Sequence, residues 1–170
     1  DVPRVVEAVR WLGRPLSQVR AVVASHLHFD HIVGIDALAA LAGCPVAVSR
    51  HAFDAAQGHV ALRAAGAPGD IWHFLGGWGM QGFPLPPVED LPFIRRAGLT
   101  PTASPFQSPL LPLDDGAALP GLPGWEAVFS PGHSDDAHCL LHREAGFLVT
   151  GDTVRNYLGG EWNPIQVDRE

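Results

Sequence analysis

The stretch SHLHFDH, residues 25–31, places the metal-binding side chains of His26, His28, Asp30 and His31 within six residues. In an extended backbone alternate side chains share one face, so His26, His28 and Asp30 are expected to point the same way. His31 requires the chain to leave strand geometry, and we expect it at a strand-to-loop corner. A solvated His-rich loop is the weaker interpretation, because accidental matches to so dense a pattern are rare.

Helical and strand-like segments alternate around this stretch. Helices are predicted over residues 3–12, 35–41 and 51–65, and strands over residues 20–25 and 45–49. The run RAVVAS, residues 20–25, has little polar alternation, which is typical of a strand covered on both faces. This order indicates an α/β arrangement, in which ligands bind beyond the carboxyl ends of the strands.

The second half of the chain is richer in strands than in helices. Strands are predicted over residues 110–113, 125–130, 137–142 and 146–150, with the last two forming a hairpin across residues 143–145.

Two further metal-capable residues follow strands in this half. The turn Ser-Pro-Gly-His at residues 130–133 would hold His133 in a fixed direction, and Asp152 follows Gly151, which permits close backbone approach. Each signal is weak alone, because an Asp after a strand is most often a turn former. Together with His26 and His28 they form a set of three imidazoles and a carboxylate, which suits zinc.

These motifs resemble those of the metallo-β-lactamase fold hydrolases. The pattern H-x-H-x-D-H stands at residues 26–31, P-G-H at residues 131–133 and G-D at residues 151–152. The resemblance implies an α+β fold, a four-layer αβ/βα sandwich of two mixed sheets with outer helices. We expect residues 1–170 to form a single such domain, truncated at both ends.

The same resemblance implies two zinc ions, with iron and manganese left open. It implies His26, His28 and His133 on the first metal, Asp30 and His31 on the second, and Asp152 bridging both. The family supplies one more His to the second metal, but no His follows His142 here. We therefore expect the second metal position to bind its ion more weakly, to be more hydrated or to be empty in this chain. One explanation is that the missing ligand lies beyond Glu170.

The expected function is hydrolysis of an ester, thioester or lactone carbonyl of a small molecule by a zinc-activated hydroxide. Asp30 is the expected catalytic residue, which orients the nucleophile. One alternative is a mononuclear iron oxygenase resembling persulfide dioxygenases, with His26, His133 and Asp152 as ligands. Another is a degenerate member that binds or assembles without catalysis.

A long segment without periodicity, residues 67–107, is expected to be a lid or an insertion loop. The tentative substrate pocket consists of Trp72, His73, Phe74 and Trp78 from this segment and of Asn156 and Tyr157 from a loop after Asp152. An alternative is that the aromatic residues fill a secondary core or the contact of a homodimer. His138 is expected to be a packed or supporting residue rather than a ligand.

Composition excludes several classes of protein. A chain of 170 residues that is 46% hydrophobic can build a real core, and its net charge of −7 argues against nucleic acid or a polybasic membrane surface as partners. No apolar run approaches the roughly 20 residues that span a bilayer. Cys44 and Cys139 lack ligand-like spacing and indicate buried thiols of a cytoplasmic protein, with a disulfide between them as the alternative. The chain opens without Met, so we leave open an upstream signal peptide.

Overall fold

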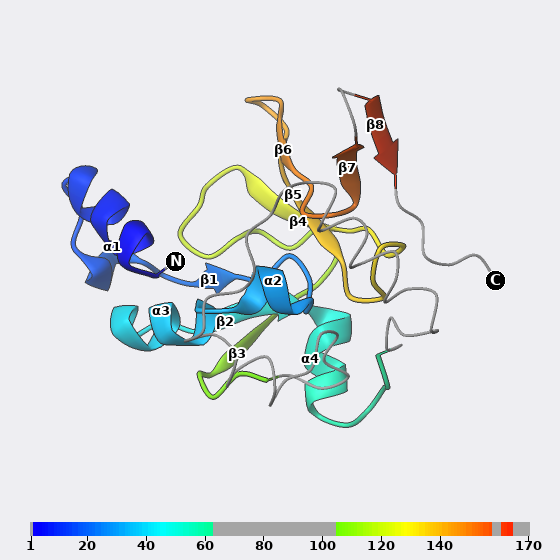
Figure 1. Ribbon diagram of the computed structural model, residues 1–170, viewed down its shortest axis with the longest axis horizontal. Coiled ribbons are helices and arrows are strands. Elements are labelled where there is room, and N and C mark those ends of the chain that lie inside the picture. The colour runs from blue at the N-terminus through cyan, green and yellow to red at the C-terminus, as the bar shows by residue number, and fades with distance from the viewer. Residues whose placement is uncertain (1, 63–104, 158–160, 165–170) are drawn as a thin grey trace.

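The computed structural model describes residues 2–62, 105–157 and 161–164, and it does not describe the side chains of Phe29 and of residues 155–164 (Figure 1). Within these residues it contains four α-helices, one 3-10 helix and eight strands. None of the described helices has both the length and the apolar character that crossing a membrane requires.

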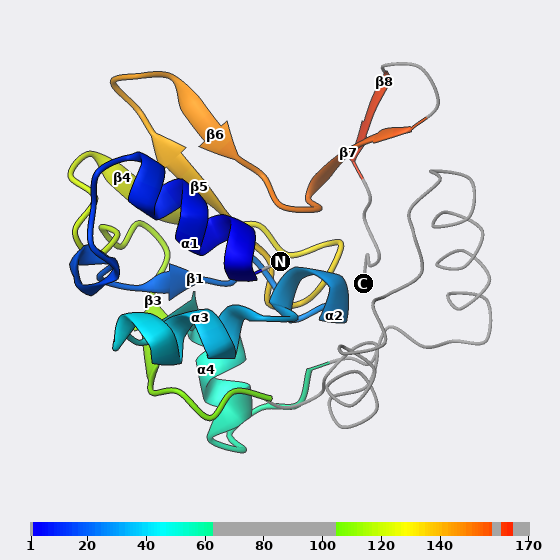
Figure 2. The same ribbon diagram turned by 60° about the vertical axis from the view of Figure 1, so that its left-hand side comes forward.

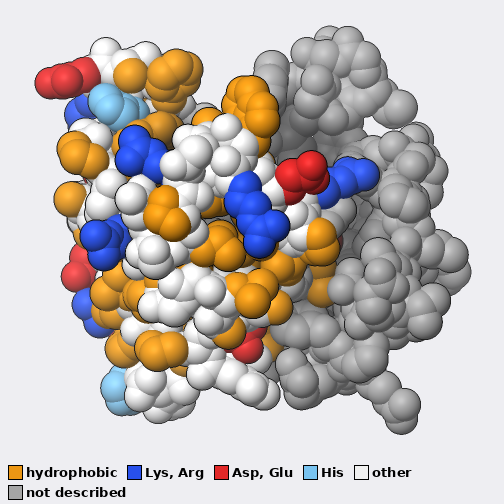
Figure 3. Space-filling view, turned by 90° about the vertical axis from the view of Figure 1, so that its left-hand side faces the viewer, with side chains coloured by type: hydrophobic (Ala, Val, Ile, Leu, Met, Phe, Trp, Pro, Cys, Tyr) orange, Lys and Arg blue, Asp and Glu red, His pale blue; other side chains and the backbone are white. Residues whose placement is uncertain are grey.

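Helix α1 (Val2–Trp11) begins the described chain and is followed by a 3-10 helix, η1 (Leu16–Gln18). It matches the helix predicted over residues 3–12, and it ends just before Gly13, whose φ of 68° is the left-handed conformation that glycine adopts readily. None of its residues is fully buried. Viewed from the side of α1, the surface shows hydrophobic side chains lying among Arg side chains (Figure 3).

The first sheet, sheet A, is parallel and contains β1 (Val22–Val23), β2 (Val46–Ser49) and β3 (Leu110–Leu113) in that order. β1 is shorter than the predicted strand, whereas β2 matches its prediction. All four residues of β2 are buried, because it is the central strand and is covered on both faces.

Helices lie between consecutive strands of sheet A along the chain. Helix α3 (Ile35–Ala42) ends at Gly43, as predicted, and α4 (Arg50–Ala56) follows β2 directly. The predicted extension of α4 to residue 65 is wrong, because Gly58 adopts a φ of 74° and its amide donates to the carbonyl of Ala55, which closes the helix. Residues 63–65 lie outside the described part.

The second sheet, sheet B, is an antiparallel meander of β4 (Trp125–Phe129), β5 (His138–His142) and β6 (Phe147–Val149). Phe129 pairs with His138 and Leu140 with Val149, so the predicted hairpin is confirmed. After it, β7 (Val154–Tyr157) and β8 (Glu161–Pro164) pair as a separate hairpin, where we expected a loop.

The core lies on both faces of sheet A. One cluster, which includes Val46 and Val48, packs against Ile32, Ala39 and Ala52 from the helices. The other joins sheet A to sheet B through Ala47, Leu113, Leu119 and Ala127. Three of the four predicted layers are therefore visible in the described part, as helices, sheet A and sheet B (Figure 2).

The two cysteines are buried, free thiols. Cys44 belongs to the cluster between sheet A and the helices, and Cys139 lies in β5. This agrees with the prediction of buried thiols, and it disagrees with the alternative of a disulfide.

Candidate metal centre

Residues 25–31 follow the carboxyl end of β1, but they do not continue as the extended strand that we predicted. β1 ends at Val23, and α2 (Phe29–Ile32) begins three residues after His26. The amides of His31 and Ile32 both donate to the carbonyl of His28, which starts this short helix. Asp30 therefore lies on a helical turn and does not alternate with His26 and His28 along a strand.

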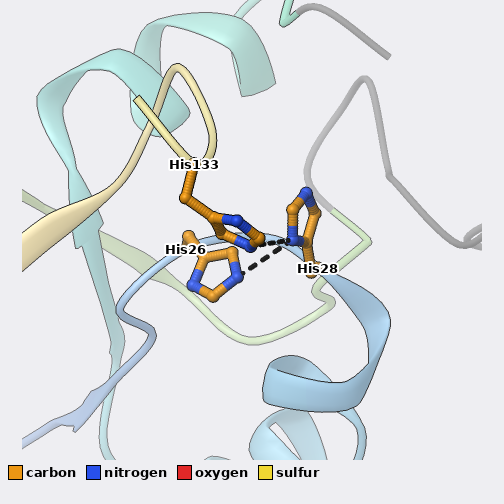
Figure 4. Close-up of side chains that lie close together, drawn as sticks. All are labelled: His26, His28 and His133. Carbon is orange, nitrogen blue, oxygen red and sulfur yellow. Dashed lines mark hydrogen bonds between the residues drawn. The ribbon is translucent and has the colours of Figure 1, made fainter. Parts of the chain in front are cut away.

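Three imidazoles converge where this segment meets the loop between β4 and β5 (Figure 4). His28 Nδ1 lies 3.0 Å from His26 Nε2 and 2.9 Å from His133 Nε2. Zinc with nitrogen ligands at about 2.0–2.1 Å in tetrahedral geometry holds those nitrogens roughly 3.3 Å apart. The observed spacing is slightly shorter than this, so a small adjustment of the rings would let the three nitrogens hold one zinc ion.

A second group of potential ligands shares His26 and adds His31 and Asp152. The carboxylate of Asp152 lies between two rings, with Oδ1 3.2 Å from His31 Nε2 and Oδ2 3.4 Å from His133 Nε2. Because each oxygen faces a different imidazole, Asp152 has the geometry of a carboxylate that could bridge two cations. The ligand atoms within each group lie within 4.8 Å of one another.

Burial and the neighbouring imidazole rings both lower the pKa of His26. Its side chain is 1% exposed, and burial lowers its pKa far below the ordinary histidine value, with further lowering from the nearby His31, His28 and His133. A neutral imidazole keeps the nitrogen lone pair that a metal needs. The environment of His26 therefore favours the form that binds metal.

Ser25 is a contact that we did not predict from the sequence. Its Oγ lies 3.2 Å from His26 Nδ1, whereas the other ring nitrogen of His26, Nε2, faces His28. Such a partner fixes the orientation of a metal-binding histidine. The signal available in the sequence was a hydroxyl residue immediately before the first His, which is too common a pattern to be informative alone.

Gly151 lies close to Ser25. This agrees with the expectation that a glycine before Asp152 permits close backbone approach. A Cβ at position 151 would lie 2.8 Å from Ser25 Oγ and 2.9 Å from Ser25 Cβ, and the φ of Gly151 is +52°. Both observations require glycine. The residue therefore lets the strand end carrying Asp152 pack against the strand end carrying His26.

The remaining predicted residues fall into three groups. The carboxylate of Asp30 is 36% exposed, belongs to neither ligand group, and lies 3.8 Å from His31 Nε2. Trp72, His73, Phe74 and Trp78 lie outside the described residues, as does most of the segment 67–107. Asn156 and Tyr157 lie in β7, but their side chains are not described.

His138 is buried next to a different feature, a cavity of about 280 Å³. Ser49, His51 and Phe129 also line this cavity, and none of the candidate ligands does. His138 belongs to neither ligand group, and burial lowers its pKa.

The chain matches the model of one known protein family. The family model described as the metallo-beta-lactamase superfamily matches residues 2–168. No curated protein matches the chain.

Solved structures with a similar fold include three that differ in source. A metallo-beta-lactamase with a HARLDQ motif from Cronobacter sakazakii is 23% identical over 82% of this chain and 43% of its own length, with a TM-score of 0.49. MEM-A1, a subclass B3 metallo-beta-lactamase from a soil metagenome library, is 21% identical over 86% of this chain and 45% of its own, with a TM-score of 0.49. TTHA1623, crystallised in a di-iron-bound form, is 18% identical over 95% of this chain and 62% of its own, with a TM-score of 0.53. The chain therefore spans less than half the length of the first two and under two thirds of the third.

Proposed function

Because the chain belongs to the metallo-beta-lactamase superfamily, we propose that it is a metal-dependent hydrolase acting on an ester, thioester or lactone carbonyl of a small molecule. The observation that carries the proposal is the convergence of His26, His28 and His133, which come from two separate loops. The net charge of −7 fits a small substrate better than a nucleic acid.

The residues at this centre suit a borderline-soft cation such as zinc, because imidazole and carboxylate are ligands that zinc prefers. His26, His28 and His133 would hold the first ion, and His31 with Asp152 would contribute to a second. A zinc ion held there would lower the pKa of a bound water to about 7, which would supply hydroxide at neutral pH.

The chain's own residues would support this chemistry in distinct ways. Ser25 Oγ, at 3.2 Å, orients the ring of His26. Asp152 reaches both His31 and His133 and would place negative charge between the two ligand groups. Asp30 is partly exposed beside His31, so it can accept a proton from an attacking water and exchange that proton with solvent.

The metal itself is open to test, since the same fold occurs in a protein crystallised with two irons. An iron oxygenase would consume oxygen, whereas a hydrolase would not. Measuring zinc, iron and manganese together with oxygen uptake therefore separates the proposed hydrolase from the iron oxygenase.

The decisive experiment pairs metal analysis of the protein with a screen of lactones, thioesters, esters and β-lactams. We expect bound zinc and turnover of a carbonyl substrate that a chelator abolishes and zinc restores. Oxygen uptake with a persulfide and one iron per chain would overturn the hydrolase assignment. Metal binding without turnover of any substrate in the screen would favour a binding role instead.

A further inference from the structure

A buried carboxylate links the two loops that carry the three converging imidazoles. The amide of Leu27, the residue between His26 and His28, donates to Asp136 Oδ2 at 2.9 Å across a sequence separation of 109 residues. Asp136 lies three residues after His133 in the loop between β4 and β5. Leu27 is 2% exposed and Asp136 is 4% exposed, so water does not compete for this bond.

A second hydrogen bond, between two backbone groups, connects the same two parts of the chain. The amide of His138 donates to the carbonyl of Ser25 at 3.1 Å, which anchors the start of β5 to the end of the β1 segment. That bond lies before His26, whereas the bond to Asp136 lies between His26 and His28. Asp136 therefore acts at the point where a shift of the backbone would move His28 relative to His133.

The use of a carboxylate at this position requires an explanation, because burying an acidic group is costly. Burial raises the pKa of Asp136, and hydrogen bonds that include the one from the Leu27 amide oppose this effect. A residue chosen only to fill space here would be apolar, since an apolar side chain of similar volume is often as stabilising. The acceptor function of Asp136 is the property that an apolar residue cannot supply.

We propose that Asp136 is a positioning residue of the metal centre: by accepting from the Leu27 amide it sets the placement of His26 and His28 relative to His133. The proposal rests on the proposed metal-binding function. It concerns metal affinity and ligand geometry, because Asp136 belongs to neither ligand group.

The test compares two substitutions of similar shape that differ in whether they can accept a hydrogen bond. Asp136→Asn keeps an oxygen for the Leu27 amide, and Asp136→Leu does not. The control is Asp115→Leu, because exposed Asp115 Oδ1 also accepts from a backbone amide, that of Phe129 at 2.8 Å, and Asp115 belongs to neither ligand group. Zinc affinity is measured by competition with a chromophoric chelator, and the ligand field is followed by the visible absorption of bound cobalt(II).

We expect Asp136→Leu to weaken zinc binding 10–100-fold and to change the cobalt(II) spectrum, since losing a partner that orients the ligands has effects of this size. Asp136→Asn should retain affinity within about threefold, and Asp115→Leu should match the wild type. If Asp136→Leu does not fold, Asp136→Ala replaces it in the same comparison. Full affinity without an acceptor at position 136, or equal weakening by Asn and Leu, overturns the inference.

Failure of this inference is distinguishable from failure of the proposed function. Wild-type protein that binds no zinc or cobalt(II) would contradict the metal centre itself. Wild-type protein that binds zinc with the same affinity as Asp136→Leu would leave the centre intact and would remove only the role of Asp136.

Discussion

The Nδ1 atom of His28 lies 2.9 Å from the Nε2 atom of His133, although 105 residues separate the two in sequence. One imidazole comes from the end of the β1 segment and the other from the loop between β4 and β5 (Figure 4). The candidate metal centre therefore depends on how sheet A packs against sheet B. Changes to a candidate ligand, to the packing near that ligand and to the bound metal should affect this centre in different ways.

Replacing a converging imidazole tests the first ligand group. In His28→Ala the nitrogen shared by the two closest ring contacts is lost, so we expect bound zinc per chain to fall at least tenfold together with activity. Metal analysis after gel filtration measures this. His59→Ala is the control, because His59 is exposed and should retain full metal content. Full metal and activity in His28→Ala would refute the assignment of His28 as a ligand.

Bound metal should stabilise the folded protein, because the ligand groups converge only in the folded state. At a free zinc concentration 100 times the dissociation constant the gain is about 2.7 kcal/mol, which raises Tm by roughly 5–10 °C for a chain of this size. Thermal unfolding with zinc, with a chelator and with magnesium checks this. Magnesium prefers oxygen ligands and should have little effect. Equal Tm values in zinc and in chelator would contradict a folded-state metal site.

Gly151→Ala should disturb the close packing of Gly151 against Ser25. The substitution adds a Cβ 2.8 Å from Ser25 Oγ at a φ of +52°, so it imposes both overlap and backbone strain. We expect a loss of about 2–5 kcal/mol of unfolding free energy, from roughly 1–2 for the left-handed conformation and roughly 1–3 for overlap, and weaker zinc binding.

Gly146→Ala separates these two contributions. Gly146 has a φ of +68° in the hairpin turn, but a Cβ there has nothing within 4 Å. It should therefore lose only about 1–2 kcal/mol from backbone strain and keep its zinc affinity. Denaturant unfolding and zinc titration of both variants make the comparison. Equal losses in both would show that the close approach to Ser25 has no energetic effect.

The pH dependence of stability should report the buried His138. Burial lowers its pKa below the reference value of 6.5, so below that pH the unfolded chain binds a proton that the folded chain does not. Stability of the chelator-treated protein should therefore fall as pH decreases below about 6.5, with His138 contributing at most about 1.4 kcal/mol per pH unit.

His138→Gln should remove this part of the slope, and His59→Gln is the control for replacing a histidine at an exposed position. Unfolding in denaturant at several pH values between 8 and 5 measures the slopes. A His138→Gln slope identical to that of the wild type would mean that His138 accepts a proton in the folded state.

Several elements were predictable because they depend on local sequence. Gly43 ends α3 where predicted, and the strands from residue 110 to residue 149 have nearly the predicted bounds. Other elements were not predictable in this way. α4 ended early because the left-handed conformation of Gly58 prevailed over the helical pattern that continues beyond it. The sequence of β7 and β8 has no alternation of apolar and polar residues that would indicate strands. These two strands form because they pair with each other.

The sequence by itself determined which residue types the candidate metal centre contains, because His26, His28, His133 and Asp152 are side chains that can bind a metal and their motifs indicate the family. Only the tertiary structure decided which side chains meet. It brought His31 and Asp152 together with His26 and left Asp30 partly exposed, because the chain turns into α2 before Asp30. It also placed Asp136 on the Leu27 amide. Contacts between residues more than a hundred positions apart follow from the packing of two sheets, and local periodicity contains no information about that packing.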